Sequence, residues 1–286
     1  IIIFSRDEYK QMLMKDLPYI KNNINLFRFY IGDVRDKNRL DWAILDEVDI
    51  VVHSAALKQV PATEYNPFET VQTNILGTQN LIEVCIKKNI NKIILISTDK
   101  AVSPINLYGS TKLTAEKLFI SGNVFKGKNK KCKFTVVRYG NVMGSRGSVI
   151  PILLNQNKNN SNFFTITHKA MTRFNITLNE ASIFVQNCLK IMKGGEIFVP
   201  KLPSYNIIDL AKAINPNKKI KIIGIRAGEK LHEEMVSAIE FRNLTEKKNF
   251  YIVGSQNSNS SKSGKLFNSY NSLDNKQYLT TKQIGT

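Results

Sequence analysis

Cysteine and histidine are scarce in this sequence, and long apolar runs are absent. The 3 cysteines, Cys85, Cys132 and Cys188, are far apart and odd in number, so they match no metal-binding spacing and argue against a disulfide framework. The 3 histidines include no His-x-x-x-His pair, and we predict no metal site. No stretch approaches the roughly 18 apolar residues of a membrane helix, so no membrane partner is expected. Unpaired cysteines favour a reducing, cytoplasmic compartment.

A glycine-rich phosphate loop is also missing. A nucleotide-binding sheet normally begins with a strand and a Gly-rich turn. Residues 1–4 form a buried-strand pattern with nothing before it. We therefore expect that the natural amino terminus, with the first strand and the phosphate loop, is absent from the chain. The glycine cluster at residues 140–147 follows a late strand, where a tight turn explains it as well as a phosphate site does.

Acidic residues are few, since 23 Asp and Glu face 41 Lys and Arg, which gives a net charge of +18. Such a charge can indicate a nucleic-acid or anionic ligand, or a Lys-rich solvated surface. The densest basic segment, residues 126–133, lies between a predicted helix and a predicted strand, where a surface loop belongs. It contains no aromatic residue to stack on bases, so we expect no nucleic-acid partner.

The chain alternates short apolar strands with amphipathic helices up to residue 147. Strands are predicted at residues 1–4, 26–30, 49–53, 92–97 and 134–137, and helices at 9–17, 40–45, 67–88 and 108–121. This alternation predicts an α/β fold with a Rossmann-like, doubly wound parallel sheet over residues 1–147. Ligands bind such sheets beyond the carboxyl ends of the strands. Asp33 and residues 53–58, 97–100 and 138–141 should therefore converge on one crevice.

The regularity weakens after residue 147. Helices are predicted at residues 149–156, 178–192, 207–214 and 230–237, and strands at 196–199 and 219–223. We interpret residues 148–253 as a smaller α/β substrate-binding lobe that covers the crevice. Residues 254–286 are rich in Ser, Asn and Lys, and this composition predicts a low-complexity, flexible tail.

Tyr108 and Lys112 are four residues apart and should share one face of a helix. A lysine beside a phenol lowers its pKa, which makes the tyrosine a usable base. The Tyr-x-x-x-Lys pattern alone is common. A preceding strand that ends in residues 97–100, Ser-Thr-Asp-Lys, strengthens the interpretation as a catalytic site.

Ser5 and Arg6 lie where the second strand of a dinucleotide-binding sheet ends and meets the adenosine ribose. An arginine there suits a 2′-phosphate, which predicts NADP rather than NAD. Arg6 is explained equally well as a solvated residue at the start of a helix.

Seven blocks, in order, carry a resemblance to a known family: residues 53–61, 97–101, 106–112, 138–148, 171–174, 195–200 and 224–234. They resemble the extended short-chain dehydrogenase/reductase superfamily. Within it, they look like the inverting UDP-N-acetylglucosamine 4,6-dehydratases that begin pseudaminic acid synthesis for flagellin glycosylation. Tyr108 favours this group, because the membrane-anchored relatives and the related epimerases tend to carry Met at that position.

The resemblance implies dehydration of a UDP-sugar with NADP as cofactor. Oxidation at C4 acidifies H5, water leaves from C6, and the hydride returns to C6. Tyr108 would be the base for the C4 hydroxyl, supported by Lys112, and Thr98 would bond the C4 oxygen. Asp99 would protonate the departing hydroxyl, and Lys100, neutral through a depressed pKa, would remove H5.

The resemblance also implies binding residues and a homo-oligomer. The cofactor-binding positions are Ser5, Arg6, Asp33, Val34, Ser54, Ala55, Ala56, Lys58, Asn74, Tyr108 and Lys112. The substrate-binding positions are Lys58, Asn141, Arg173, Arg226 and Glu229. A guanidinium matches a diphosphate bidentately, although each of these cations is also explained as ordinary surface charge.

Two other functions remain open. A nucleotide-sugar 4- or 5-epimerase of the same superfamily would need no acid–base pair at Asp99 and Lys100, which otherwise reads as a surface ion pair after a strand. A non-catalytic binding fragment is favoured by the absence of the Gly-rich loop.

Overall fold

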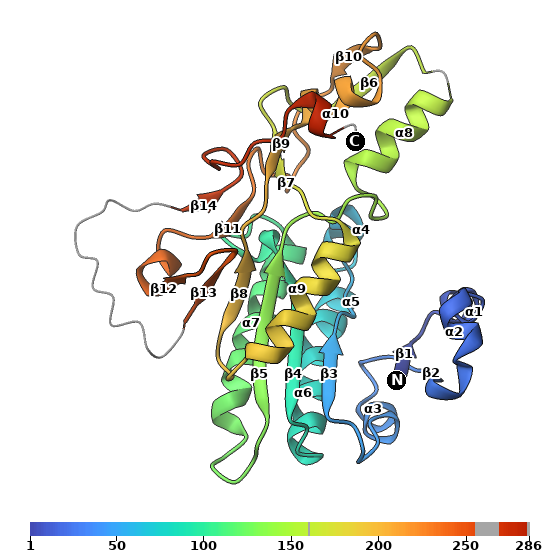
Figure 1. Cartoon of the computed structure of the whole chain (residues 1–286), viewed down its shortest axis with the longest axis vertical. Coiled ribbons are helices and arrows are strands. Elements are labelled where there is room, and N and C mark those ends of the chain that lie inside the picture. Colours follow the sequence, from blue (N-terminus) through green and yellow to red (C-terminus); the bar gives the residue numbers. More distant parts are fainter. Residues whose placement is uncertain (160, 255–268, 285–286) are drawn as a thin grey trace.

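The computed structural model describes residues 1–159, 161–254 and 269–284 (Figure 1). Its strands are β1 (Ile2–Ser5), β2 (Arg28–Ile31), β3 (Ile50–His53), β4 (Lys92–Thr98), β5 (Lys133–Tyr139), β6 (Phe163–Ile166), β7 (Thr172–Phe174), β8 (Ile197–Pro200), β9 (Ser204–Asn206), β10 (Lys219–Ile222), β11 (Glu234–Val236), β12 (Leu244–Glu246), β13 (Phe250–Val253) and β14 (Tyr270–Asn271).

The α-helices are α1 (Glu8–Lys15), α2 (Pro18–Asn22), α3 (Lys37–Ala43), α4 (Val60–Tyr65), α5 (Pro67–Val71), α6 (Gly77–Lys87), α7 (Leu107–Phe125), α8 (Val149–Lys158), α9 (Leu178–Ile191), α10 (Ile207–Ile214) and α11 (Thr281–Ile284). Single turns of other helix types are η1 (Ile24–Leu26), η2 (Gln72–Leu76), η3 (Asp99–Ala101) and η4 (Glu240–Asn243).

Six strands form the main sheet, in the order β12-β13-β8-β5-β4-β3. The four strands from β3 to β8 are parallel, whereas β13 and β12 add to the far edge in antiparallel fashion. Apolar residues in β4 alternate between the faces, so Ile93 and Leu95 enter one core and Ile94 enters another. The parallel centre confirms the predicted α/β, Rossmann-like class.

Helices cover both faces of this sheet. The core with Ile93 and Leu95 includes Leu81 of α6 and Phe119 of α7. The opposite core, around Ile94, includes Cys188 of α9, and Figure 1 shows α9 crossing the sheet on that side. This layering leaves the carboxyl ends of β3, β4 and β5 open to the loops that follow them.

The first two strands form a separate two-stranded parallel sheet (Figure 1). In the part of the chain described, β1 pairs with β2 alone, and β3 pairs with β4 alone. Among the described strands no backbone ladder joins β1 to β3, so the parallel strands of residues 1–147 lie in two sheets. The small sheet is connected to the rest through α3, whose Leu40 lies in the same core as Leu81.

A second core supports the smaller lobe. It contains Leu153 of α8, Phe164 of β6, Tyr205 of β9 and Leu210 of α10. The predicted boundary at residue 147 does not separate this lobe from the main sheet, because β8, β12 and β13 belong to that sheet. The chain enters the lobe with α8 and β6, returns to the main sheet at β8, and re-enters the lobe at β9 and α10.

The helix predicted at residues 230–237 is wrong. That segment contains β11, which pairs antiparallel with β14, a strand that follows much later in the chain. The predicted flexible tail also fails for residues 269–284, because Tyr270 is buried in the main core and its hydroxyl donates to Leu202 O at 3.1 Å. Residues 255–268, the rest of that prediction, lie outside the described residues.

None of the helices in the described ranges combines the length and the apolar character that crossing a membrane would need. Within the same ranges, no group of three or more His, Cys, Asp or Glu side chains is arranged to hold a metal ion. The 3 cysteines are buried free thiols.

Candidate active site

The reactive side chains follow the carboxyl end of β4. Thr98 ends the strand, and its Oγ accepts a 3.3 Å hydrogen bond from Lys100 N, which stabilises the turn η3. Asn106 caps α7 by accepting from Gly109 N at 2.8 Å. A Cβ at position 109 would lie 2.2 Å from Lys100 O, so the glycine lets α7 pack directly on η3. This close approach brings Tyr108 beside the Asp99–Lys100 turn.

Lys100 is held by three oxygen atoms from three parts of the chain. Its Nζ lies 3.0 Å from Asp99 Oδ1, 3.1 Å from Glu233 Oε1 and 3.1 Å from Asn141 Oδ1. Asp99 is fully buried, and the Lys100 side chain is 23% exposed. The pair is therefore not a surface ion pair. Asn141, predicted for substrate binding, meets Lys100 as the strand-end argument required.

The charge states of this pair depend on burial and on partners. Burial raises the pKa of Asp99, with a further contribution from Glu233, although Lys100 opposes the shift. Burial lowers the pKa of Lys100, but Asp99 and Glu233 outweigh it and the net direction is upward. The expectation of a depressed Lys100 pKa is wrong for this state of the site, because two carboxylates face one ammonium.

Tyr108 and Lys112 are both buried on one side of α7, but they do not interact as predicted. Burial raises the pKa of Tyr108 to about 12, and the cation that opposes this shift is Lys100. Lys112 Nζ donates to Ile96 O at 2.7 Å. Burial lowers the pKa of Lys112 to about 8, against the effect of Glu116. The expectation that Lys112 lowers the pKa of Tyr108 is wrong here.

A buried arginine ties the elements around the site together. Arg138, at the end of β5, has no exposed side-chain surface. Its Nη2 lies 2.6 Å from Glu116 Oε2 on α7 and 3.0 Å from Glu240 Oε1, and its Nη1 donates to Met235 O at 2.8 Å. Through these bonds α7, β5 and β11 keep fixed relative positions.

The predicted cofactor residues at the ends of β1 and β2 form their own group. Arg6 Nη1 lies 3.3 Å from Asp33 Oδ2, and the Arg6 side chain remains 52% exposed. Ser5 Oγ accepts from Asp7 N at 3.1 Å. Val34 is buried against α6, where a Cβ at Gly77 would lie 2.6 Å from Val34 Cγ2. The structure brings these residues together at one sheet end, with the guanidinium open to solvent.

The loop after β3 borders a hollow of about 420 Å³. Ser54 and Ala55 are exposed, whereas Ala56 and Lys58 line the hollow. Two further cations, Lys10 and Arg146, lie on its wall, and Glu69 contributes a carboxylate. The lining therefore offers positive charge next to the predicted cofactor loop.

Asn74 fixes this loop from the π-helical turn η2, which interrupts the otherwise confirmed helix at residues 67–88. Its Oδ1 accepts from Leu57 N at 2.8 Å, and its Nδ2 donates to Leu57 O at 2.9 Å and to Thr111 Oγ at 3.0 Å. The amide predicted for cofactor binding is thus occupied inside the protein, where it positions residues 54–58.

The two candidate diphosphate arginines differ in exposure. Arg173 is buried, and its guanidinium donates to Thr172 O at 2.7 Å and to Lys230 O at 3.0 Å. Backbone carbonyls therefore already accept hydrogen bonds from the Arg173 guanidinium, which was a candidate for the diphosphate. Arg226 is 63% exposed, and its Nη2 lies 3.0 Å from Glu229 Oε1.

Glu233 is the residue that sequence reasoning missed. It lies between two cations, with Oε1 3.1 Å from Lys100 Nζ and 3.7 Å from Arg173 Nε. Its position within the block 224–234 could have pointed to it. The local sequence, however, does not show that the pairing of β11 brings this block to the end of β4.

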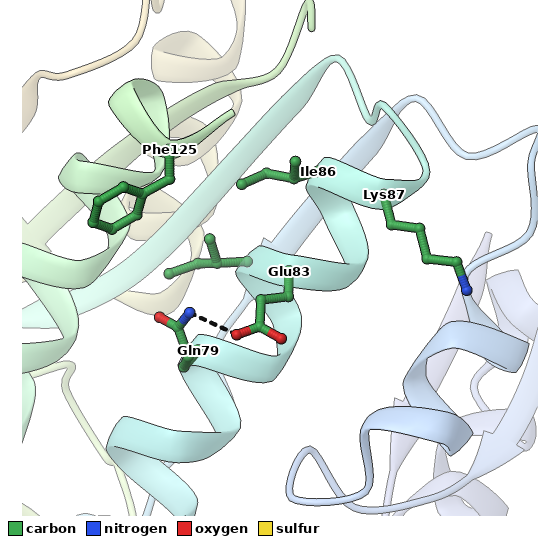
Figure 2. Close-up of a pocket in the computed structure, with 6 residues that line it drawn as sticks. Gln79, Glu83, Ile86, Lys87 and Phe125 are labelled. Carbon is green, nitrogen blue, oxygen red and sulfur yellow. Dashed lines mark hydrogen bonds between the residues drawn. The ribbon is translucent and has the colours of Figure 1, made fainter. Parts of the chain in front are cut away.

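A second hollow, of about 360 Å³, lies between α6 and the end of α7 (Figure 2). Phe125 and Ile86 give it an apolar side, and Gln79 Nε2 donates to Glu83 Oε1 at 2.8 Å on the other. It shares no residue with the Asp99–Lys100 cluster.

Known proteins resemble this chain in sequence and in fold. A family model described as "Polysaccharide biosynthesis protein" matches residues 1–255. An inverting UDP-N-acetylglucosamine 4,6-dehydratase from Campylobacter jejuni is 50% identical over 253 residues, which cover 88% of this chain and 74% of that protein. A UDP-glucose 4-epimerase from Rickettsia bellii is 45% identical over 257 residues, which cover 88% and 73%.

Solved structures agree on the fold. The X-ray structure of Pen from Bacillus thuringiensis has a TM-score of 0.89 at 39% identity and covers 99% of this chain and 88% of that one. The dTDP-glucose 4,6-dehydratase DesIV from Streptomyces venezuelae has a TM-score of 0.66 at 16% identity, covers 80% and 86%, and shares the fold alone. The chain belongs to the polysaccharide biosynthesis protein family, with the extended short-chain dehydrogenase/reductase fold that its sequence blocks predicted.

Proposed function

We propose that this chain is a C5-inverting UDP-N-acetylglucosamine 4,6-dehydratase, a lyase that uses NADP and serves surface-glycan synthesis, including flagellin glycosylation. The observation that carries the proposal is the buried Asp99–Lys100 pair next to Tyr108. An elimination needs both an acid and a base besides the tyrosine, whereas an epimerisation does not. The 50% identical relative from Campylobacter jejuni, named as such a dehydratase, supports it.

The residues present fit a nicotinamide dinucleotide. Lys10, Lys58 and Arg146 line the hollow beside the loop 54–58, and cations are the side chains that a pyrophosphate requires. The exposed guanidinium of Arg6 suits a 2′-phosphate, which supports NADP over NAD. Lys112 donates one hydrogen bond to Ile96 O and has further protons for a ribose hydroxyl. When bound, the dinucleotide supplies the hydride acceptor and donor for the sugar.

The acid and base roles are assigned from position and charge. Tyr108 can receive the proton of the C4 hydroxyl only after it has lost its own, a loss that burial opposes and the nearby Lys100 favours, and Thr98 is placed to bond the C4 oxygen. Asp99, whose pKa is raised by burial, is the acid for the C6 hydroxyl as it leaves. Lys100 removes H5 once it has lost its own proton.

The diphosphate of a UDP-sugar would be held mainly by Arg226. It is the exposed arginine of the loop at residues 224–229, and Glu229 orients it by an ion pair. Lys58 and Asn141 complete the predicted substrate positions. Burial lowers the pKa of Lys58, and the charge of Lys100 adds to this shift. Arg173 forms ion pairs with Glu229 and Glu233, at 3.8 Å and 3.7 Å.

Mass spectrometry of the product tests the function. The full chain is incubated with UDP-N-acetylglucosamine and NADP⁺. A dehydratase lowers the product mass by one water, whereas an epimerase, the second candidate favoured by the Rickettsia bellii relative, leaves it unchanged. Titration of NADP⁺ by calorimetry separates both from a non-catalytic fragment. Lys100→Ala should abolish the product while the circular dichroism spectrum stays unchanged, and full turnover by this variant would refute the role.

A homo-oligomer and a cytoplasmic location belong to the same proposal. Large apolar side chains, among them Phe68, Val124 and Phe125, are exposed near α5 and α7, which supports contact with a second copy. The free, buried cysteines support a reducing compartment. Light scattering should give a mass above that of one chain, and Val124→Glu should lower it.

A further inference from the structure

We propose that Glu233 is the proton partner of Lys100: it accepts a proton from Lys100 Nζ before the amine removes H5 of the sugar. This inference rests on the proposed dehydratase function and adds a residue to it. Glu233 does not contact the reacting carbon in this scheme, so it is a positioning residue that acts through Lys100.

The geometry places two carboxylates on one ammonium. Lys100 Nζ lies 3.1 Å from Glu233 Oε1 and 3.0 Å from Asp99 Oδ1. Both carboxylates are buried, and the second oxygen of each, Glu233 Oε2 and Asp99 Oδ2, has no hydrogen-bond partner within the described chain. A buried polar atom without a partner is rare in native proteins and calls for an explanation. An oxygen that periodically takes up a proton provides one.

The surrounding charges determine where protons reside before the reaction. The charged and titratable groups that face the pair are Asp99, Arg173, Lys58, Lys230, Tyr108 and Tyr205. Burial raises the pKa of Asp99. Burial also raises the pKa of Glu233, but the charges of Lys100 and Arg173 outweigh burial, and the net shift of this pKa is downward. The directions of these shifts favour a proton on Asp99 over one on Glu233, with Lys100 charged.

The proposed step moves one proton over a single hydrogen bond. An N–H bond of Lys100 breaks and an O–H bond forms on Glu233, which leaves a neutral amine beside a neutral carboxyl group. A sugar that displaces water from the site favours this neutral pair, because charges are costly in a dry environment. The amine then takes H5, and Asp99 gives its proton to the departing C6 hydroxyl.

The same contacts restore the site. After elimination Lys100 is charged again, Asp99 is ionised and Glu233 carries the extra proton. Because Lys100 Nζ bonds both carboxylates, it can pass that proton from Glu233 to Asp99. The proton count of the three residues then equals the starting count.

An independent contact fixes Glu233 for this role. Its backbone N–H donates to Ser272 Oγ at 2.9 Å, and Ser272 N donates to Glu233 O at 2.8 Å. Ser272 is fully buried and lies beyond residue 255, where the family match ends. The main chain of Glu233 is thus clamped from a distant segment, as a residue that must hold one distance to Lys100 requires.

The first test measures Lys100 without sugar or cofactor. Cyanate carbamylates neutral lysine, and mass spectrometry of peptides gives the pH midpoint for Lys100 alone. Glu233→Gln removes the counter-charge and should lower that midpoint by about 1 to 3 pH units, as expected for the loss of an opposite charge at this range. The matched control is Glu234→Gln, since the Glu234 carboxylate accepts from Ser103 Oγ at 2.8 Å instead. An unchanged midpoint in Glu233→Gln would overturn the proposal.

The second test measures turnover. Glu233→Gln should reduce kcat by about 10²- to 10⁴-fold, the usual contribution of a proton-transfer group, with little change in KM. Glu233→Asp keeps the charge, should recover part of kcat, and serves as the test variant if Glu233→Gln does not fold. Wild-type kcat in both variants would refute the role. A shifted Lys100 midpoint in a chain that makes no dehydrated product would refute the dehydratase function and support control of Lys100 by Glu233.

Discussion

Ser272 Oγ accepts a 2.9 Å hydrogen bond from the backbone N–H of Glu233. The same hydroxyl lies 2.7 Å from Thr172 Oγ, so one buried side chain joins the segment after β14 to β7 and to the residue before β11. Composition alone predicts that this part of the chain is a tail. The contact connects it to the ion pairs around Lys100. The position of Glu233 beside Lys100 therefore depends on residues 269–284.

We expect Ser272→Ala to destabilise the fold by about 1 to 3 kcal/mol, because it leaves the buried N–H of Glu233 without its partner and removes one of the two hydrogen bonds of the Thr172 hydroxyl. Urea unfolding should show a lower midpoint with an unchanged slope. Ser182→Ala is the control, since Ser182 is exposed on α9, and its effect should stay within about 0.5 kcal/mol. Equal effects of the two substitutions would show that the clamp does not stabilise the fold.

The buried pair of Arg138 and Glu116 gives a second stability prediction. Glu116→Gln keeps the shape of the side chain but removes a charge that lies 2.6 Å from Arg138 Nη2. Removing one partner of a buried pair typically costs about 3 to 5 kcal/mol, and Glu240 offsets part of this because it also binds Arg138. Chemical denaturation should therefore show a loss near the lower value. Lys117→Gln, the exposed next residue of α7, should change stability little, and a similarly small loss for Glu116→Gln would contradict the prediction.

Lys112 predicts a pH dependence of stability. Burial lowers its pKa to about 8 from 10.5, so the unfolded state binds more protons than the native state between these pH values. Stability contributed by Lys112 therefore rises with pH across this window. The difference in unfolding free energy between wild type and Lys112→Met should grow by about 3 kcal/mol, since one unit of pKa shift corresponds to about 1.4 kcal/mol.

The contributions of the cysteines and tyrosines to the pH dependence cancel in this difference, because these groups titrate in both proteins. Lys117→Met supplies the control, because this lysine is exposed and its curve should run parallel to wild type. A constant difference between wild type and Lys112→Met from pH 8 to 10.5 would mean that Lys112 is solvated in the native state.

Local pattern was sufficient for most elements and for the first half of the site. Alternation of apolar residues in β4 and helical spacing in α10 are short-range properties, so both elements were predicted within a few residues. The rule that parallel strands end at one edge brought Asn141 to Lys100 without any structural information.

The failures share a physical cause, which is dependence on distant partners. The pairing of β11 with β14 leaves no periodic signal, and the position of Glu233 follows from it. The pKa directions of Lys100 and Tyr108 were predicted from residues nearby in the sequence. In the structure, burial raises the pKa of Tyr108, and Asp99 together with the distant Glu233 raises that of Lys100. Arg173 was a candidate for the diphosphate, with ordinary surface charge as the alternative, but it is buried and donates to backbone carbonyls of residues 230 and 231.

Arg226 carries the prediction on substrate binding. It is the more exposed of the two candidate arginines, and its pairing with Glu229 holds the guanidinium at the loop surface. Arg226→Ala should weaken binding of UDP at least about tenfold, because a charge-assisted hydrogen bond contributes about 1.5 to 3 kcal/mol and 1.4 kcal/mol is tenfold in affinity. Calorimetry with UDP alone measures this without turnover. Lys219→Ala, an exposed cation on β10 of the same lobe, should leave the affinity unchanged. Equal affinities for wild type and Arg226→Ala would move the diphosphate away from this loop and toward the cations Lys58 and Arg146 of the larger hollow.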